Sequence, residues 1–184
     1  MKRLLLFTLL LLTGILSAQD KYYLGVNGGI ANVIHYPAGM AVTLEAGSIL
    51  PNNLEATLSV SLIKSETDMT DLNDKARYMH IPVMIGFRYY FWNSFIRTYM
   101  GAEMGLSYFK NDVYLVTTDE TVNPPVKTLT KDSYKGIYYG VAPNLGLMLP
   151  VTGGISLWVN GKIHFLSDSY GQYSSLSAGL QFQL

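Results

Sequence analysis

Six charged side chains stand inside stretches of sequence that otherwise alternate between apolar residues and small or polar ones. All six fall on the polar side of their stretch, which a folded chain would turn towards a shared interior. Buried charges of opposite sign are tolerated when they are paired and hydrogen-bonded, so we expect an ion-pair network that fills this interior. The alternative is a gate whose rearrangement opens a narrow ion path. The six residues are Glu45, Glu55, Arg88, Arg97, Glu103 and Lys162.

Two of these cations should lie close together near one rim of the fold. If Trp92-Asn93 forms a two-residue hairpin, Arg88 and Arg97 face each other beside it. Two neighbouring guanidinium groups repel each other and need carboxylates. Glu45 and Glu55 lie at similar distances from their own turn, so they are the expected partners. The remaining acid and base lie farther from this rim.

The sequence offers little for catalysis or metal binding. Nucleophilic hydrolysis needs a nucleophile, a base and an orienting acid, and the nearest approach is His164 with Ser167 and Asp168. Two residues separate His164 from Ser167, so a continuing strand turns them to opposite faces. His35, His80 and His164 are scattered without the spacing of a metal site. We expect no catalytic residue, no metal and no cofactor, and hydrogen-bonding roles for the histidines.

Two long polar segments, 64–77 and 109–133, are the expected places for surface binding. The first is acidic but does not match a calcium-binding loop, because it lacks the central glycine and the terminal glutamate. Its carboxylates could share divalent cations with lipid phosphates. The second could extend its strands as a protruding edge that recruits a partner by strand addition. The candidate surface-binding residues are Glu66, Asp68, Asp71, Asp74, Asp119 and Glu120.

Composition narrows the possible functions. The chain has 184 residues, with 13 basic and 13 acidic side chains and no cysteine. Nucleic-acid binding is disfavoured because phosphate contacts need a basic surplus. Disulfide scaffolds, thiolate metal sites and cysteine nucleophiles are excluded.

The first residues are typical of a secretory signal peptide. Met1-Lys2-Arg3 precede an apolar run from Leu4 to Leu12, and small residues lead to Ala18. This order of basic, apolar and small residues predicts removal of residues 1–18. An uncleaved signal anchor is the alternative, although the apolar run is short for a bilayer span. Removal leaves 11 basic against 13 acidic groups, so residues 19–184 form one mildly acidic domain of net charge 11 − 13 = −2.

Alternation with a period of two residues recurs along the rest of the chain and predicts β-strands. The turns at 51–53, 92–93 and 150–153 are short, and the long segments fall between other pairs of strands. This pattern predicts an all-β fold, an eight-stranded antiparallel up-and-down barrel with short turns at one rim. The expected strands cover 22–31, 39–49, 54–62, 79–91, 96–108, 135–149, 155–165 and 176–184.

Alternation alone does not say which face points inwards. A soluble calyx places its apolar face inside, and a membrane barrel places it outside. The polar face carries mainly small residues and only the six charges, whereas a water-facing exterior usually carries many more. The apolar face carries no charge in its body, as lipid contact requires, because a mid-depth Arg or Lys there costs about 2–4 kcal/mol. We therefore favour the membrane barrel.

With these strands assigned, the chain resembles the small outer-membrane β-barrel family of Gram-negative bacteria. This porin family includes the OmpA-like and OmpX-like eight-stranded barrels. The segment from Tyr78 to Phe91, with Ile81-Pro82 before an aliphatic run and an aromatic finish, is similar to a recurring strand of that family. The segment from Thr98 to Tyr108 resembles the strand that follows it. The chain departs from the family by ending on Leu184 instead of an aromatic residue.

The resemblance implies an outer-membrane protein with a structural or surface-binding role and no catalysis. Its implied partners are outer-membrane lipids including lipopolysaccharide, the outer-membrane insertion machinery and an extracellular ligand. A narrow channel for ions or small solutes is the first alternative. A lipid A-modifying esterase is the second, although such barrels carry a His-x-Ser spacing that this chain lacks at His164 and Ser167.

Overall fold

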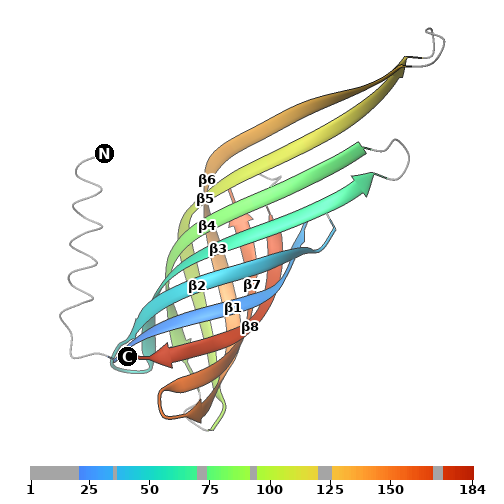
Figure 1. The fold of residues 1–184 in the computed structure, drawn as a ribbon. Coiled ribbons are helices and arrows are strands. Elements are labelled where there is room, and N and C mark those ends of the chain that lie inside the picture. Colours follow the sequence, from blue (N-terminus) through green and yellow to red (C-terminus); the bar gives the residue numbers. More distant parts are fainter. Residues whose placement is uncertain (1–20, 35–36, 70–73, 92–94, 120–125, 168–171) are drawn as a thin grey trace.

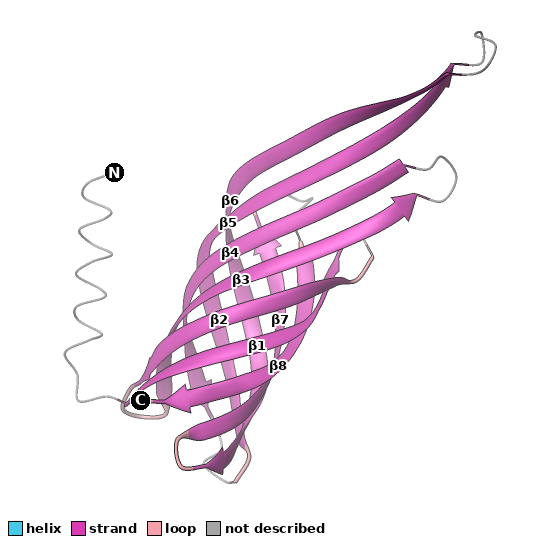
Figure 2. Ribbon diagram, in the orientation of Figure 1, coloured by secondary structure: helices cyan, strands magenta, loops and turns pink. Residues whose placement is uncertain are grey.

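The computed structural model describes residues 21–34, 37–69, 74–91, 95–119, 126–167 and 172–184. The expected signal peptide therefore lies outside the described residues. The described chain folds into strands joined by turns (Figure 2). It contains no helix long and apolar enough to cross a membrane. The strands are β1 (Lys21–Val33), β2 (Gly39–Ile49), β3 (Leu54–Met69), β4 (Asp74–Tyr90), β5 (Arg97–Asp119), β6 (Val126–Thr152), β7 (Ile155–Leu166) and β8 (Tyr173–Gln183).

The strands form a closed barrel in sequence order, each antiparallel to its neighbours (Figure 1). β8 returns to β1 and closes the sheet, with Val26 opposite Leu180 and Tyr23 opposite Gln183. Closure leaves no unpaired edge through the body of the barrel, which a sheet surrounded by lipid requires. The predicted eight-stranded up-and-down topology is confirmed.

The two faces of the sheet differ as the alternation predicts. Large apolar side chains are exposed on the outside, including Leu44 at 62%, Phe87 at 60% and Met104 at 61%. The inside is lined by buried polar and charged groups and aromatic rings. A soluble calyx would show the reverse arrangement, so the apolar face points outwards.

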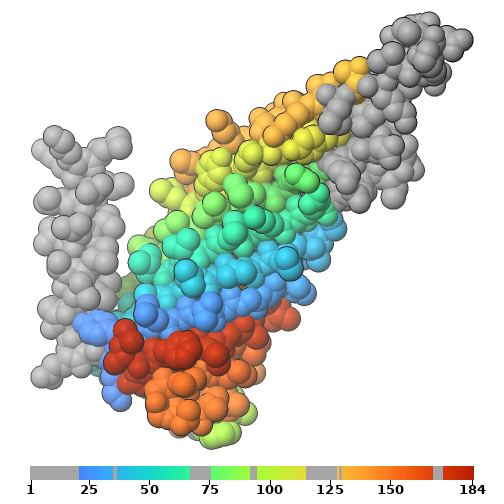
Figure 3. Space-filling model, in the orientation of Figure 1, coloured from blue at the N-terminus to red at the C-terminus, as the bar shows by residue number. Residues whose placement is uncertain are grey.

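Strands β3 to β6 continue well beyond β7, β8 and β1 at one end of the barrel (Figures 1 and 3). Segments 64–77 and 109–133 were expected to be loops, but they are largely the outer ends of two β-hairpins. Lys64 pairs with Met79, and pairing continues from Lys110 with Lys135 up to Asp119 with Val126. The loop interpretation was wrong because these extensions are rich in polar and charged residues, so their strands carry no regular apolar alternation. The other expectation, that 109–133 extends its strands as a protruding edge, agrees with the β5–β6 pairing.

The opposite rim has short turns. Asn52 and Asn53, in the tight loop between β2 and β3, both have φ of 61°, a left-handed conformation that Asn tolerates. The turn expected at 150–153 lies slightly later: β6 runs to Thr152 with an irregularity after Pro150, and Gly154 has φ of 92°.

The turn expected at Trp92-Asn93 lies outside the described residues, but its flanking register is settled. Tyr90 pairs with Tyr99, and their ring centroids are 5.4 Å apart. Arg88 therefore pairs with Gly101, and the expected juxtaposition of Arg88 with Arg97 is wrong. A two-residue turn at 92–93 would have shifted the register of β5 by four residues, so that Arg88 paired with Arg97 instead of Gly101.

Candidate functional site

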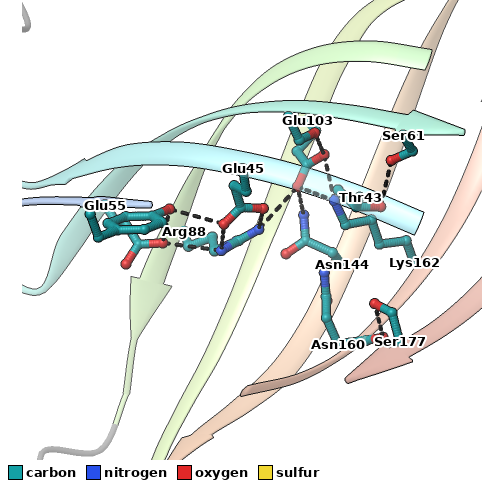
Figure 4. Close-up of polar contacts among 12 residues, drawn as sticks. Thr43, Glu45, Glu55, Ser61, Arg88, Glu103, Asn144, Asn160, Lys162 and Ser177 are labelled. Carbon is teal, nitrogen blue, oxygen red and sulfur yellow. Dashed lines mark hydrogen bonds and ion pairs between the residues drawn. The ribbon is translucent and has the colours of Figure 1, made fainter. Parts of the chain in front are cut away.

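Arg88 is the centre of a charged cluster in the lumen. It projects inwards from β4, and its side chain is completely buried. Its Nη1 donates to Oε1 of Glu45 at 2.6 Å, and its Nη2 donates to the other oxygen of the same carboxylate. Nη1 also donates to Glu55 at 3.1 Å. One cation on β4 thus joins the inner faces of β2 and β3 (Figure 4).

Glu103 on β5 connects this centre to a second cation. Lys162 on β7 donates to both oxygens of Glu103, at 2.7 and 2.8 Å. Arg88 approaches the same carboxylate at 3.4 Å. Ser59 and Asn144 donate to it at 3.2 and 3.3 Å. Ion pairs and hydrogen bonds therefore run across the lumen from Glu55 to Lys162 (Figure 4).

Aromatic side chains complete the lumen cluster. The Tyr23 hydroxyl lies 3.0 Å from Glu45 and 2.8 Å from Glu55, so the two carboxylates share its one proton. Tyr90 donates to the second oxygen of Glu55 at 2.7 Å. The Arg88 guanidinium carbon lies 5.0 Å from the ring centroid of Tyr99 and 4.6 Å from that of Trp158, within cation–π range. The sequence analysis missed these four aromatic residues, although each falls on an inward position of its strand.

Five of the six predicted lumen charges therefore come together. Three carboxylates and two cations leave the cluster with one excess negative charge (2 − 3 = −1). Every oxygen of these carboxylates accepts at least one hydrogen bond, so the acids are desolvated but satisfied. Nε of Arg88 is buried without a hydrogen-bond partner among the described residues. Arg97 is the exception among the six. It is exposed at the rim opposite Met148, and the described residues show no ion pair for it.

His80 and His164 are buried and contact the same ring. His164 stacks on Tyr173 with centroids 3.9 Å apart, and His80 meets Tyr173 edge-on at 4.9 Å. Within the described ranges, no cluster of three or more His, Cys, Asp or Glu residues could hold a metal ion. His164 faces the lumen, whereas Ser167 is exposed beyond β7. His35 and Asp168 lie outside the described residues.

The extended hairpins carry their charges in pairs, some across strands and some within one strand. Arg77 donates to Glu66 at 3.0 Å, which raises the pKa of Arg77. Lys110 donates to Asp112 at 2.7 Å and Ser133 donates to it at 2.6 Å. These hydrogen bonds, that of Lys110 foremost, lower the pKa of Asp112 to about 2.

The structure spreads the six acids that were expected to bind at the surface along the two hairpins. Glu66 is paired with Arg77 on β3. Asp68, Asp74 and Asp119 belong to the backbones of β3, β4 and β5. Asp71 and Glu120 lie outside the described residues. The described part of the hairpins does not gather these acids into one site.

Solved structures of outer-membrane barrels resemble this fold. The attachment invasion locus protein Ail of Yersinia pestis has a TM-score of 0.59 at 11% identity, over 90% of this chain and 97% of that one. Neisserial surface protein A has a TM-score of 0.56 at 16% identity, over 91% and 98%. A major outer-membrane protein of Thermus thermophilus has a TM-score of 0.61 at 11% identity, over 89% and 99%.

A search of curated proteins found no match. The fold resemblance expected from the sequence is confirmed by these barrels. Residues 6–182 match a family described as "Protein of unknown function (DUF3575)". The chain belongs to this DUF3575 family and has the fold of the small outer-membrane β-barrels.

Proposed function

We propose that this protein is an outer-membrane barrel with a plugged lumen, which acts through its extended hairpins and not by catalysis. Residues 1–18 direct export and are removed, and the insertion machinery places residues 19–184 in the membrane. The observation that carries the proposal is the ion-pair network centred on Arg88, which joins five strands across the interior.

The plug follows from the dimensions of the barrel and the contents of its lumen. An eight-stranded barrel has an interior just wide enough for side chains to fill. Arg88, Glu55 and Glu103 have at most 2% exposure, and Trp158 has 1%. A solute or hydrated ion would have to displace paired charges whose separation in a low-dielectric interior is costly. Such a barrel serves as a membrane anchor for what projects from it.

The projecting part supports a surface-binding role. β6 pairs with β7 only from Gly140 onwards, so the segment from Val126 to Tyr138 is paired with β5 alone among the described strands. Its outer backbone groups are therefore available to an extended segment of an extracellular partner. Ail, a barrel of this fold, has been crystallised with the heparin analogue sucrose octasulfate.

A narrow ion channel is the second candidate, because the same network could act as a gate. Its excess negative charge would favour cations over anions in any path that opened. Arg97 is not part of such a gate in this arrangement, since it lies at the exposed rim.

Conductance in planar bilayers separates the two candidates. We expect the wild-type chain to show no stable conducting level. Arg88→Ala removes the central cation and side-chain volume and should produce brief openings, whereas Arg97→Ala should remain silent. A stable, cation-selective conductance of the wild type that is altered by Arg88→Ala would overturn the plug and support the gate.

A further inference from the structure

The outer face of the barrel changes from apolar to positively charged between two neighbouring rows of paired residues. In the lower row, Val42 and Leu62 pair across β2 and β3, and Ile81, Tyr108 and Ile137 pair across β4 to β6. In the next row towards the hairpins, pairing joins Met40, Lys64, Met79, Lys110 and Lys135 across β2 to β6. The apolar belt therefore ends abruptly at a row that contains three lysines.

A cavity of about 570 Å³ lies at this boundary. Lys64, Arg77 and Lys110 contribute cations to its lining, and Met40 and Met79 contribute apolar surface. Glu66 and Asp112 also line it. We call this cavity, together with the neighbouring Lys135, the lysine cleft. It combines positive charge with an apolar surface that continues into the belt below.

The acids of the cleft are already engaged. Glu66 is 3.0 Å from Arg77. Asp112 is 2.7 Å from Lys110 and 3.4 Å from Lys131. The divalent-cation bridging expected from the acids of segment 64–77 therefore has no support at Glu66, whose carboxylate is bonded to a cation.

The cations of the cleft exceed its acids. Lys64, Arg77, Lys110 and Lys135 give four positive charges against two from Glu66 and Asp112, an excess of two. Among the described residues, Lys64 and Lys135 have no carboxylate within ion-pair distance. Lys135 is also directly opposite Lys110 in the register, and like charges in such positions are unfavourable. A bound anion would relieve this repulsion.

We propose that the lysine cleft binds the phosphate groups of a phosphorylated glycolipid in the outer leaflet of the membrane. The position of the cleft favours a lipid headgroup over a soluble anion, because the apolar rows below offer contact to acyl chains while the lysines reach the phosphates. Lysine suits this boundary, since its stem lies along apolar surface and its ammonium reaches the polar layer. The inference rests on the proposed membrane location of the barrel.

Native mass spectrometry of the refolded mature chain in zwitterionic detergent tests the proposal. The probes are diphosphorylated lipid A, fully dephosphorylated lipid A and inorganic phosphate. The test variant is Lys64→Gln/Lys135→Gln. Its control, Lys21→Gln/Arg97→Gln, removes the same charge from the opposite rim, where both residues are exposed. Heat-modifiable gel mobility first establishes that each chain is folded.

We expect the wild type to bind diphosphorylated lipid A and to ignore the dephosphorylated form. The test variant should bind about 25-fold more weakly, about fivefold for each lysine, and the control should stay within about twofold of the wild type. Equal loss in the control, or displacement by equimolar inorganic phosphate, would overturn the assignment. A folded wild type that does not bind lipid A refutes only this inference, whereas a chain without heat-modifiable mobility refutes the proposed barrel as well.

Discussion

Arg88→Met removes the cation on which the lumen network depends and puts an unbranched apolar side chain in its place. Glu55 keeps Tyr90 and a share of the Tyr23 proton, and Glu103 keeps Lys162. Glu45 loses both of its hydrogen bonds from Arg88 at once and retains only Tyr23. The main cost is therefore one buried, uncompensated carboxylate, and leaving a buried charge unpaired lowers the free energy of unfolding by about 3–5 kcal/mol.

A second substitution that removes one negative charge should partly restore the stability lost in Arg88→Met. Arg88→Met changes the cluster from −1 to −2, and adding Glu45→Gln returns it to −1. We expect the double variant to be more stable than the sum of the single losses predicts, by about 0.5–3 kcal/mol, as for directly contacting residues.

Urea unfolding of the refolded chain in detergent, followed by tryptophan fluorescence and gel mobility, measures these differences. Arg97→Met is the control, because Arg97 is exposed at the rim. It should lie within about 0.5 kcal/mol of the wild type. The reasoning is refuted if Arg88→Met is no more destabilising than Arg97→Met, or if Glu45→Gln adds its full cost in the double variant.

Three further predictions concern the hairpins and the barrel wall. The pKa of Asp112 is lowered to about 2, so the contribution of Asp112 to hairpin stability should be complete at neutral pH. This contribution should disappear as the pH falls from the unfolded-state pKa near 4 through the folded-state pKa. An NMR titration of the Asp112 carboxyl group should show a higher pKa in Lys110→Gln. Gly105→Ala brings a Cβ against the backbone oxygen of Val83 and should cost about 1–3 kcal/mol, whereas Gly161→Ala, whose nearest neighbour would be 3.8 Å away, should be tolerated in the same unfolding assay. Replacing residues 115–130 by Asn-Gly should leave the heat-modifiable band intact but abolish binding of extended peptides from a peptide library, and unchanged binding would contradict the role of the β5–β6 hairpin.

The sequence was sufficient to predict the strand faces and most of the lumen charges. Side chains in a strand alternate strictly, so the inward placement of Glu103 and Lys162 followed from counting alone. Their meeting follows from the up-and-down strand order, which places β5 and β7 on either side of β6.

The strand register and the local geometry of the lumen were harder to predict from the sequence. The offset between Arg88 and Arg97 depends on where β4 and β5 end, and the Trp92-Asn93 signal placed that turn too tightly. The donors Tyr23 and Tyr90 could be placed in the lumen by parity, but only the three-dimensional register shows that both reach Glu55. The hairpin extensions are rich in polar and charged residues and show no regular apolar alternation, so their sequence did not distinguish strand from loop.

Spin-label accessibility along β6 tests the plugged membrane barrel most directly, because the chain has no cysteine and each label can be placed singly. Cysteines at Val141, Leu145 and Leu147 sample the outer face, and those at Ala142 and Met148 sample the lumen. In lipid bilayers we expect outward labels to collide with oxygen but not with a water-soluble nickel complex, and lumen labels to be shielded from both. Nickel access at the lumen positions would reveal an open pore, and nickel access at the outward positions would place the apolar face in water; either result would contradict the account.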